Sequence, residues 1–182
     1  MISIANIVSA VANPYTPWRT LGGIDVVYNG DMPLYFTGNA SVIFTVFWQG
    51  QKKVLKCYTR RNPYLKAIYG KRFLASELCV SDIMGRRHWV DCLLSDYIEG
   101  VTLHEKLCQS LTPTELSAIA TAFDLMACNL LEQEFAHGDL KPENIIVCLD
   151  GQMNAIDWDA AFVPALSGNK AQETPSYGRG RR

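Results

Sequence analysis

The stretch His137-Gly138-Asp139-Leu140-Lys141-Pro142-Glu143-Asn144 carries the densest chemical information in this chain of 182 residues. It places a carboxylate, an amine and a carboxamide close together at Asp139, Lys141 and Asn144. Phosphoryl transfer uses such groups: a carboxylate accepts the proton of the attacking hydroxyl, a cation lies near the transferred phosphate, and an amide oxygen binds Mg²⁺. Asp157 follows at the end of the next segment and is a second candidate metal ligand.

The flanking segments predict a helix before this stretch and a β-hairpin after it. Thr112-Pro113-Thr114-Glu115 forms a capping box with proline at the first helical position. Apolar residues recur at helical spacing behind it, so we expect a helix to about Glu134 with one face in the core. Ile145–Leu149 and Ala155–Asp159, joined by Asp150-Gly151, predict a hairpin with polar residues at both ends.

Together these features resemble the catalytic loop and metal-binding motif of the protein-kinase superfamily, H-R-D-L-K-P-x-N followed by D-F-G. The resemblance implies that Asp139 is the catalytic base and that Lys141 stabilises charge on the transferred phosphate. It also implies that Asn144 and Asp157 bind Mg²⁺ at the phosphates of ATP. We therefore expect an α+β, bilobed kinase-like fold, with an antiparallel sheet and one helix in the first lobe and a truncated helical second lobe.

The first half of the chain is rich in predicted strands. Short β-branched and aromatic runs indicate strands at Leu34–Thr37, Val42–Trp48, Lys53–Tyr58 and Cys92–Ile98. The residues of 64–80 are expected to be helical, and the first eleven residues to form a short amphipathic helix. We expect three parts: an N-terminal extension over 1–33, a kinase N-lobe over 34–98, and a partial C-lobe over 99–182 that ends in the activation segment.

The kinase resemblance extends to the predicted nucleotide-binding residues of the first half. Val54-Leu55-Lys56 resembles the V-A-I-K strand, which implies that Lys56 contacts the α- and β-phosphates of ATP. Glu77 is the first acidic residue after Lys56 and falls in the expected helix, so it is the preferred ion-pair partner of Lys56. Asp82 is the weaker alternative, because it lies past the expected end of that helix.

Two further segments resemble parts of an ATP site. The run from Leu93 to Gly100 resembles the strand that leads into the hinge, which implies that backbone groups of Asp96 and Ile98 face adenine and that Ser95 is the gatekeeper. On the G-x-G-x-x-G-x-V pattern of the phosphate loop, only Gly38 is retained. Phe36 and Ser41 replace two other glycines and suggest a looser clamp on the phosphates.

Some positions depart from the kinase pattern. Gly138 replaces the usual Arg, and Asp157-Trp158-Asp159 replaces D-F-G, as in aminoglycoside and other small-molecule phosphotransferases. Asp159 could bind metal or remain solvated. Thr174-Pro175-x-Tyr177 resembles the end of an activation segment, but no A-P-E follows before Arg182. We expect either a minimal kinase or a fragment, and in a fragment the helix headed by Thr112 should expose apolar surface.

Composition fits one domain with a sizeable core, since 48% of the residues are hydrophobic and the net charge is −1. Residues 1–90 hold 11 Lys/Arg against 4 Asp/Glu, whereas residues 91–182 hold 6 against 14. This asymmetry indicates either carboxylates gathered for a metal or two differently solvated surfaces. The six scattered cysteines predict reduced core residues in a cytoplasmic protein. No segment resembles a membrane span.

The expected function is that of an ATP- and Mg²⁺-dependent phosphotransferase resembling a Ser/Thr protein kinase, with a protein substrate. One alternative keeps the chemistry and takes a small molecule or a lipid-linked sugar, as a lipopolysaccharide-type kinase does. Another is a nucleotide-binding pseudokinase scaffold. Neither a nucleic-acid nor a membrane partner is expected, because a solvated face explains the basic stretch Lys52–Arg72.

Overall fold

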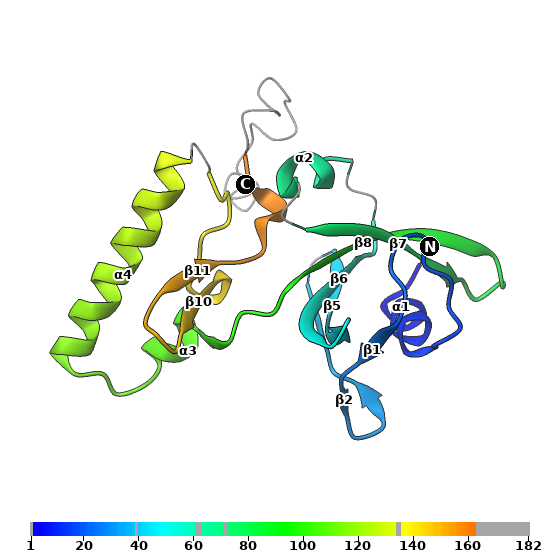
Figure 1. Ribbon diagram of the computed structural model, residues 1–182, viewed down its shortest axis with the longest axis horizontal. Helices are drawn as coiled ribbons and strands as arrows, with labels where there is room; N and C mark the ends of the chain where they lie inside the picture. The colour runs from blue at the N-terminus through cyan, green and yellow to red at the C-terminus, as the bar shows by residue number, and fades with distance from the viewer. Residues whose placement is uncertain (1, 39, 61–62, 71–72, 134–135, 163–182) are drawn as a thin grey trace, which may run out of the picture. The chain divides into compact units, whose positions relative to one another are not determined.

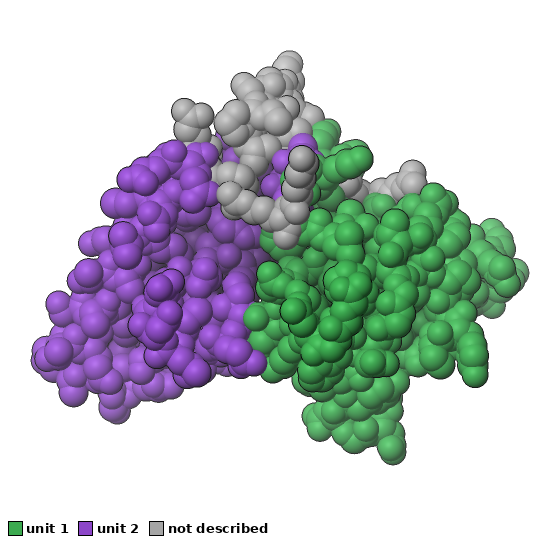
Figure 2. All heavy atoms as spheres, in the orientation of Figure 1, with its two compact units in different colours: residues 1–66, 70–97 green, residues 67–69, 98–182 purple. Residues whose placement is uncertain are grey.

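The computed structural model describes residues 2–38, 40–60, 63–70, 73–133 and 136–162. It confirms a mixed α+β protein with antiparallel sheets and few helices. The chain divides into two compact units, shown in Figure 1 and coloured separately in Figure 2. Unit 1 comprises residues 1–66 and 70–97, and unit 2 comprises residues 67–69 and 98–182.

Unit 1 is built on a curled antiparallel sheet with the strand order β1-β5-β6-β8-β7, in which β4 also pairs with β5. The strands are β1 (Ile24–Val26), β4 (Tyr35–Thr37), β5 (Ser41–Trp48), β6 (Gln51–Tyr58), β7 (Leu74–Ser81) and β8 (Arg87–Asp96). A separate ribbon consists of β2 (Tyr28–Asn29) and β3 (Met32–Pro33). The predicted strands are confirmed, and the turn between β5 and β6 has positive φ at Gln49 and Gly50, which matches the twist of a tight hairpin.

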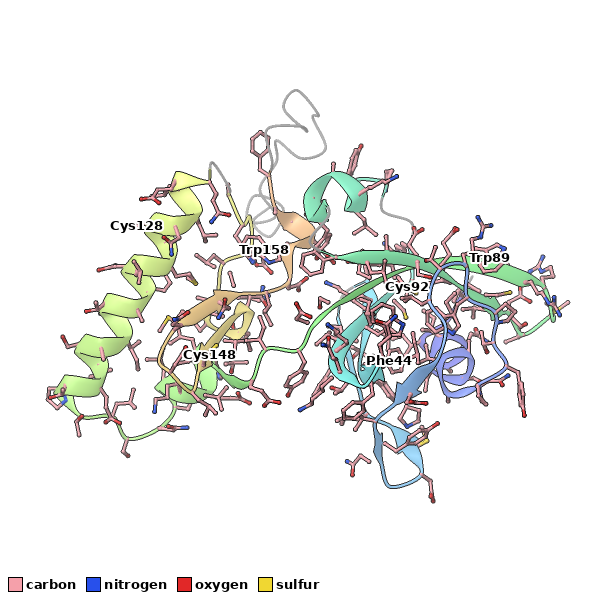
Figure 3. All side chains as sticks on the ribbon, viewed as in Figure 1. Phe44, Trp89, Cys92, Cys128, Cys148 and Trp158 are labelled. Carbon is pink, nitrogen blue, oxygen red and sulfur yellow. The ribbon has the colours of Figure 1, made fainter. Side chains whose placement is uncertain are left out.

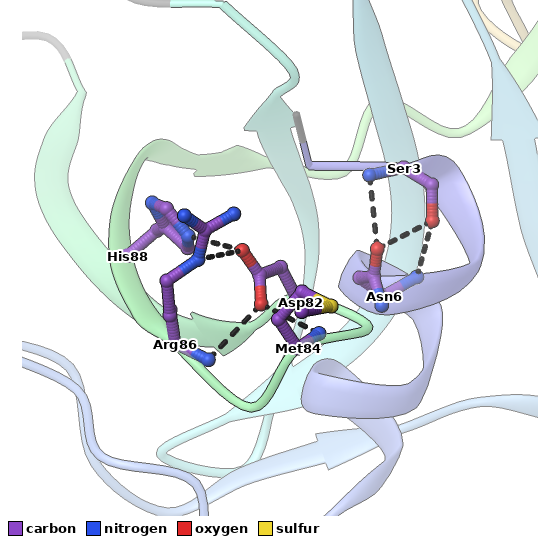
Figure 4. Close-up of polar contacts among 6 residues, drawn as sticks. All are labelled: Ser3, Asn6, Asp82, Met84, Arg86 and His88. Atoms are coloured by element: carbon purple, nitrogen blue, oxygen red, sulfur yellow. Dashed lines mark hydrogen bonds and ion pairs between the residues drawn. The ribbon is translucent and has the colours of Figure 1, made fainter.

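The helix α1 (Ile4–Ala12) covers one face of this sheet (Figure 1). It begins at Ser3, whose Oγ accepts a hydrogen bond from the backbone N–H of Asn6 (Figure 4). Its apolar side chains are buried together with alternate residues of the sheet, including Ile7, Phe44 and Leu55. Because side chains alternate between the two faces of a strand, this core leaves the intervening residues on the opposite face. The predicted amphipathic helix is confirmed.

Residues after α1 cover the outer edge of β7. The backbone N–H of Cys79 donates to the Pro17 carbonyl at 3.0 Å, and that of Arg19 donates to the Glu77 carbonyl at 3.1 Å. The Ser76 hydroxyl accepts hydrogen bonds from the backbone of Leu21, which is itself buried. The main-chain groups of this terminal strand are therefore paired on both sides along this stretch.

The predicted helix over 64–80 is wrong beyond its first turn. The helix α2 spans only Leu65–Tyr69 and stops at Gly70, which has a φ of +55°. Residues 74–81 form β7, paired in register with β8 over its whole length. Burial of Leu78 and Val80 with a two-residue period fits a strand better than a helix.

The turn between β7 and β8 is organised by the buried carboxylate of Asp82 (Figure 4). It accepts hydrogen bonds from the backbone N–H groups of Met84 and Arg86, from Arg86 Nε and from His88 Nε2, all at 2.9–3.0 Å. The bond from His88, followed by those from the turn backbone, holds the pKa of Asp82 well below its ordinary value. Asp82 therefore stabilises the turn, which accounts for an acidic residue at this position without an ion pair to Lys56.

Unit 2 consists of a small sheet with helices beside it. Its elements are β9 (Gly100–Thr102), α3 (Leu103–Leu107), α4 (Pro113–Glu132), the 3₁₀ turn η1 (Pro142–Asn144), β10 (Ile145–Cys148), β11 (Met153–Ala155) and the 3₁₀ turn η2 (Trp158–Ala160). The sheet has the order β11-β10-β9, and its core contains Leu103, Met126, Ile145 and Met153. The predicted hairpin after Asn144 is confirmed as β10–β11, but its second strand is Met153–Ala155, so the predicted run Ala155–Asp159 is wrong beyond Ala155.

The helix α4 has the predicted start but is buried less than expected. Thr112 Oγ1 accepts from the backbone N–H of Glu115, and the Glu115 carboxylate accepts from that of Thr112, which confirms the capping box. Met126 is buried, whereas Leu116 is 47% exposed and Leu131 is 76% exposed. The prediction of one face in the core therefore holds for the middle of α4 and is wrong for its two ends, among the described residues.

The cysteines are only partly where the sequence predicted them. Cys57, Cys79 and Cys92 are buried, and burial raises the pKa of the Cys57 thiol well above its ordinary value. Cys108 and Cys128 are exposed, so the expectation of core positions is wrong for them. Within the described ranges, the structure has no helix that is both long and apolar enough to cross a membrane.

Candidate active site

Asn144 comes directly before β10 and Asp157 comes two residues after β11, so the hairpin β10–β11 (Figure 1) brings both to its open end. Ile145 pairs with Ala155, and one step further the backbone N–H of Ile156 donates to the Asn144 carbonyl at 2.8 Å. Asp157 comes next in the chain. Antiparallel pairing thus brings the backbone of Asn144 next to Ile156, the residue before Asp157.

Asp139, Lys141 and Asn144 form one connected polar group. Lys141 Nζ lies 3.0 Å from Asp139 Oδ2. Asn144 Nδ2 donates to the same Oδ2 at 3.1 Å and to the Asp139 carbonyl at 2.9 Å. The hydrogen bond to Asp139 raises the pKa of Lys141, so this amine remains protonated at neutral pH. The carboxylate is partly exposed, so it can be reached from solvent while two neighbours hold its position.

Asp157 has a left-handed backbone conformation, with φ and ψ both at 61°. Such a conformation costs a non-glycine residue roughly 1–3 kcal/mol and persists only where the surroundings hold it. His137 supplies part of that restraint: its Nε2 donates to the Ile156 carbonyl at 2.8 Å. Its ring also lies against Trp158, with ring centroids 4.4 Å apart (Figure 3 labels Trp158).

Asp159, the third residue of this motif, accepts a hydrogen bond from the Tyr69 hydroxyl at 2.5 Å. The sequence left open whether this carboxylate binds metal or remains solvated. In the structure it contacts the buried phenol of Tyr69, which like Asp159 belongs to unit 2.

Gly138 cannot be replaced by a residue with a side chain without movement of the backbone. Its φ is +76°, and a Cβ atom at this position would lie 2.0 Å from the Ala160 carbonyl oxygen. The neighbouring Ala136 and Phe162 form a backbone bridge, so the loop and the segment after η2 run side by side here. This close approach accounts for a glycine at position 138.

We expect unit 2 to lose stability as the pH falls below about 7, because of His137. Desolvation lowers the pKa of His137 below its ordinary 6.5, while the bond to Ile156 and nearby carboxylates act in the opposite direction. The unfolded chain then binds a proton that the folded chain excludes, so the free energy of unfolding decreases as the pH falls through 6.5. The slope from one proton is at most about 1.4 kcal/mol per pH unit.

Urea denaturation between pH 8 and pH 5 measures this slope. His137→Gln retains an amide that can donate to Ile156 and should flatten it. His104→Gln is the control for removal of another imidazole from unit 2, because the His104 side chain is 55% exposed. A wild-type stability that is constant between pH 7 and pH 5 would contradict the interpretation.

Lys56 and Glu77 lie on the sheet of unit 1. Lys56 is buried on β6, in register with Leu93, on the face opposite to α1. Glu77 belongs to β7 and not to a helix, and it forms a 2.9 Å ion pair with Arg19. Strand alternation places Glu77 and its cross-strand neighbour Asp91 on the same face as Lys56. The prediction that Glu77 lies in a helix is therefore wrong. Its side chain nevertheless lies on the same face of the sheet as the cationic side chain of Lys56.

The other predicted nucleotide-binding residues occupy strand ends and turns. Asp96 is the last residue of β8 and its carboxylate lies 2.5 Å from Lys53 Nζ. Ile98 is the first residue of the second segment of unit 2. Gly38 follows β4, and its N–H donates to the Ser41 carbonyl at 2.9 Å. Thr174, Pro175 and Tyr177 lie outside the described residues.

The donor atoms of unit 2 suit a hard cation such as Mg²⁺. Within the described ranges, no group of three His, Cys, Asp or Glu side chains could hold a metal. Mg²⁺ does not need one, because it usually binds one or two carboxylates together with phosphates and water. Asp157 supplies a carboxylate whose charge reaches Lys141. Asn144 uses its Nδ2 atom to donate to Asp139, which leaves its amide oxygen as a second oxygen ligand. These residues therefore fit the ion.

The sequence indicated the polar residues of the loop but not the contacts of Tyr69 and His137.

A scan against protein-family models and a search of curated proteins found no match. The function of the chain therefore has to be inferred from its residues and their contacts.

Proposed function

We propose that this chain is an ATP- and Mg²⁺-dependent phosphotransferase with a protein-kinase-like fold, which phosphorylates Ser and Thr hydroxyls of proteins. The observation that carries the proposal is the joint contact of Lys141 and Asn144 with Asp139, together with Asp157, whose negative charge helps to raise the pKa of Lys141. Its free cysteines support a cytoplasmic location for this activity.

Each residue of the group has a role that its contacts allow. Asp139 would accept the proton of the attacking hydroxyl, since its carboxylate is partly exposed and oriented by two neighbours. Lys141 would stabilise the charge that develops on the transferred phosphoryl group, because it stays protonated. Asn144 and Asp157 would hold Mg²⁺, which neutralises charge on the phosphates of ATP when bound.

Unit 1 supports the same proposal through Lys56. In protein kinases the lysine that contacts ATP lies on the third strand of the sheet. Lys56 lies on β6, the third strand when β4 and β5, which flank Gly38, are taken as the first two. Glu77 and Asp91 of the neighbouring strands β7 and β8 lie on its sheet face, and we propose that they orient Lys56 in place of a carboxylate from the helix.

Isothermal titration with ATP, in the presence and absence of Mg²⁺, tests the nucleotide and metal parts of the proposal. We expect wild type to bind ATP more tightly with Mg²⁺, and Asp157→Ala to lose this difference, because the ion would lose a carboxylate ligand. Asp150→Ala is the matched control, since Asp150 is an exposed carboxylate at the other end of the same hairpin. If wild type does not bind ATP, the proposal is wrong.

A small-molecule acceptor is the second candidate. The close approach of Gly138 to Ala160 favours it, because this geometry excludes the Arg that receives an activation-loop phosphate in regulated protein kinases. Lys141 suits a protein kinase better. Comparing phosphate transfer to basic peptides with transfer to sugars and aminoglycosides distinguishes the two acceptor classes. Mg²⁺-dependent ATP binding without transfer to any acceptor would favour a pseudokinase scaffold.

A further inference from the structure

The contact between Tyr69 and Asp159 joins two parts of unit 2 that lie 90 residues apart in sequence. Tyr69 is only 5% exposed, so its hydroxyl is withdrawn from most of the solvent. The Tyr69 hydroxyl donates to Asp159 Oδ1, and a hydrogen bond to a carboxylate is stronger than one between neutral groups. Asp159 lies two residues after the candidate metal ligand Asp157.

The contacts around Asp157 differ on its two sides. On the N-terminal side, the carbonyl of Ile156 accepts from His137, and its N–H donates to Asn144. On the C-terminal side, Trp158 packs on His137 and Asp159 accepts from Tyr69. The left-handed conformation of Asp157 is uncommon for a non-glycine residue, although Asp tolerates it better than most, so these contacts on both sides favour it.

We propose that Tyr69 is a positioning residue, whose hydrogen bond to Asp159 holds Asp157 in the conformation that binds Mg²⁺. This inference rests on the proposed function. The helix in this region was expected to supply the carboxylate that pairs with Lys56, whereas α2 is here given the role of supplying Tyr69. Its sequence, Leu65-Lys66-Ala67-Ile68-Tyr69, contains no carboxylate that could pair with Lys56, and it offers a phenol to the metal-binding turn instead. Asp159 is accordingly an anchor of the turn and not a metal ligand.

The test measures ATP affinity with and without Mg²⁺ for Tyr69→Phe, Asp159→Ala and the double variant. We expect each single variant to weaken Mg²⁺-dependent binding about tenfold, as is usual for residues that orient a metal ligand. Binding of ATP without Mg²⁺ should not change, which a general loss of structure would not allow. The double variant should be no weaker than a single one, because both substitutions remove the same bond. Tyr15→Phe, at an exposed phenol, is the control.

The outcomes separate this inference from the proposed function. If wild type binds ATP with a Mg²⁺ dependence that Tyr69→Phe and Asp159→Ala leave unchanged, the positioning role is wrong and the phosphotransferase proposal stands. Additive effects of the two substitutions would also overturn it. If Tyr69→Phe does not fold, the test rests on Asp159→Ala alone. The positioning role is then judged by the ratio of its ATP affinities with and without Mg²⁺, compared with that of wild type. Absence of ATP binding in wild type overturns both.

Discussion

Asp139→Asn is expected to lower kcat by about 10²–10⁴-fold and to leave ATP binding nearly unchanged. The carboxamide has the shape of the carboxylate and can still accept from Lys141, whose amine lies 3.0 Å away. It cannot take a proton from an attacking hydroxyl at neutral pH. The substitution therefore separates the proposed base from the proposed binding residues.

Phosphate transfer from labelled ATP to an acceptor that wild type uses gives kcat, and titration calorimetry gives ATP affinity. Asp150→Asn provides the control, because it makes the same chemical change at the far end of the hairpin. Turnover retained by Asp139→Asn would remove Asp139 from the role of base. A parallel loss of turnover and ATP binding would instead indicate damage to the whole loop.

Gly138→Ala is expected to destabilise unit 2 by at least about 2–3 kcal/mol. Roughly 1–2 kcal/mol comes from the left-handed backbone, which an L-residue adopts at a cost. The remainder comes from the new Cβ atom, which would lie 2.0 Å from the Ala160 carbonyl oxygen and must displace the backbone. The loop that carries Asp139 would then move relative to η2.

Gly151→Ala is the matched control for this prediction. Gly151 has a similar φ of +84°, but a Cβ atom there meets nothing within 4 Å. It should therefore show only the backbone cost, and the difference between the two variants in urea denaturation isolates the contact with Ala160. Equal destabilisation by both substitutions would show that the loop does not approach Ala160 closely in solution.

Features set by local chemistry could be predicted from the sequence. In the capping box that starts α4, the side chains of Thr112 and Glu115 accept hydrogen bonds from each other's backbone N–H groups. Because the two residues are only three positions apart, the pattern can be recognised in the sequence. The turn at Gln49-Gly50 between two β-rich runs is local in the same way. A second capping box, Thr102 with Glu105, starts α3 and has an equally local pattern.

Features set by distant pairing could not be predicted. Residues 74–81 contain Leu, Ala and Glu, which favour a helix, but pairing with β8 decides that they form a strand. Glu77 was placed in a helix for this reason. In the candidate site, the positions of Asp139, Lys141 and Asn144 follow from one short loop. The bond from Tyr69 to Asp159 spans 90 residues and leaves no pattern in the sequence.

The pairing of Pro17–Arg19 with the outer edge of β7 has a consequence for self-association. A terminal strand with open N–H and C=O groups can template the addition of a strand from another molecule. Here the polypeptide that precedes the sheet occupies that position, and α1 covers the apolar residues beside it. Without its first 21 residues, unit 1 would expose the unpaired backbone groups of β7 next to apolar side chains. Aggregates and fibrils grow from such a combination.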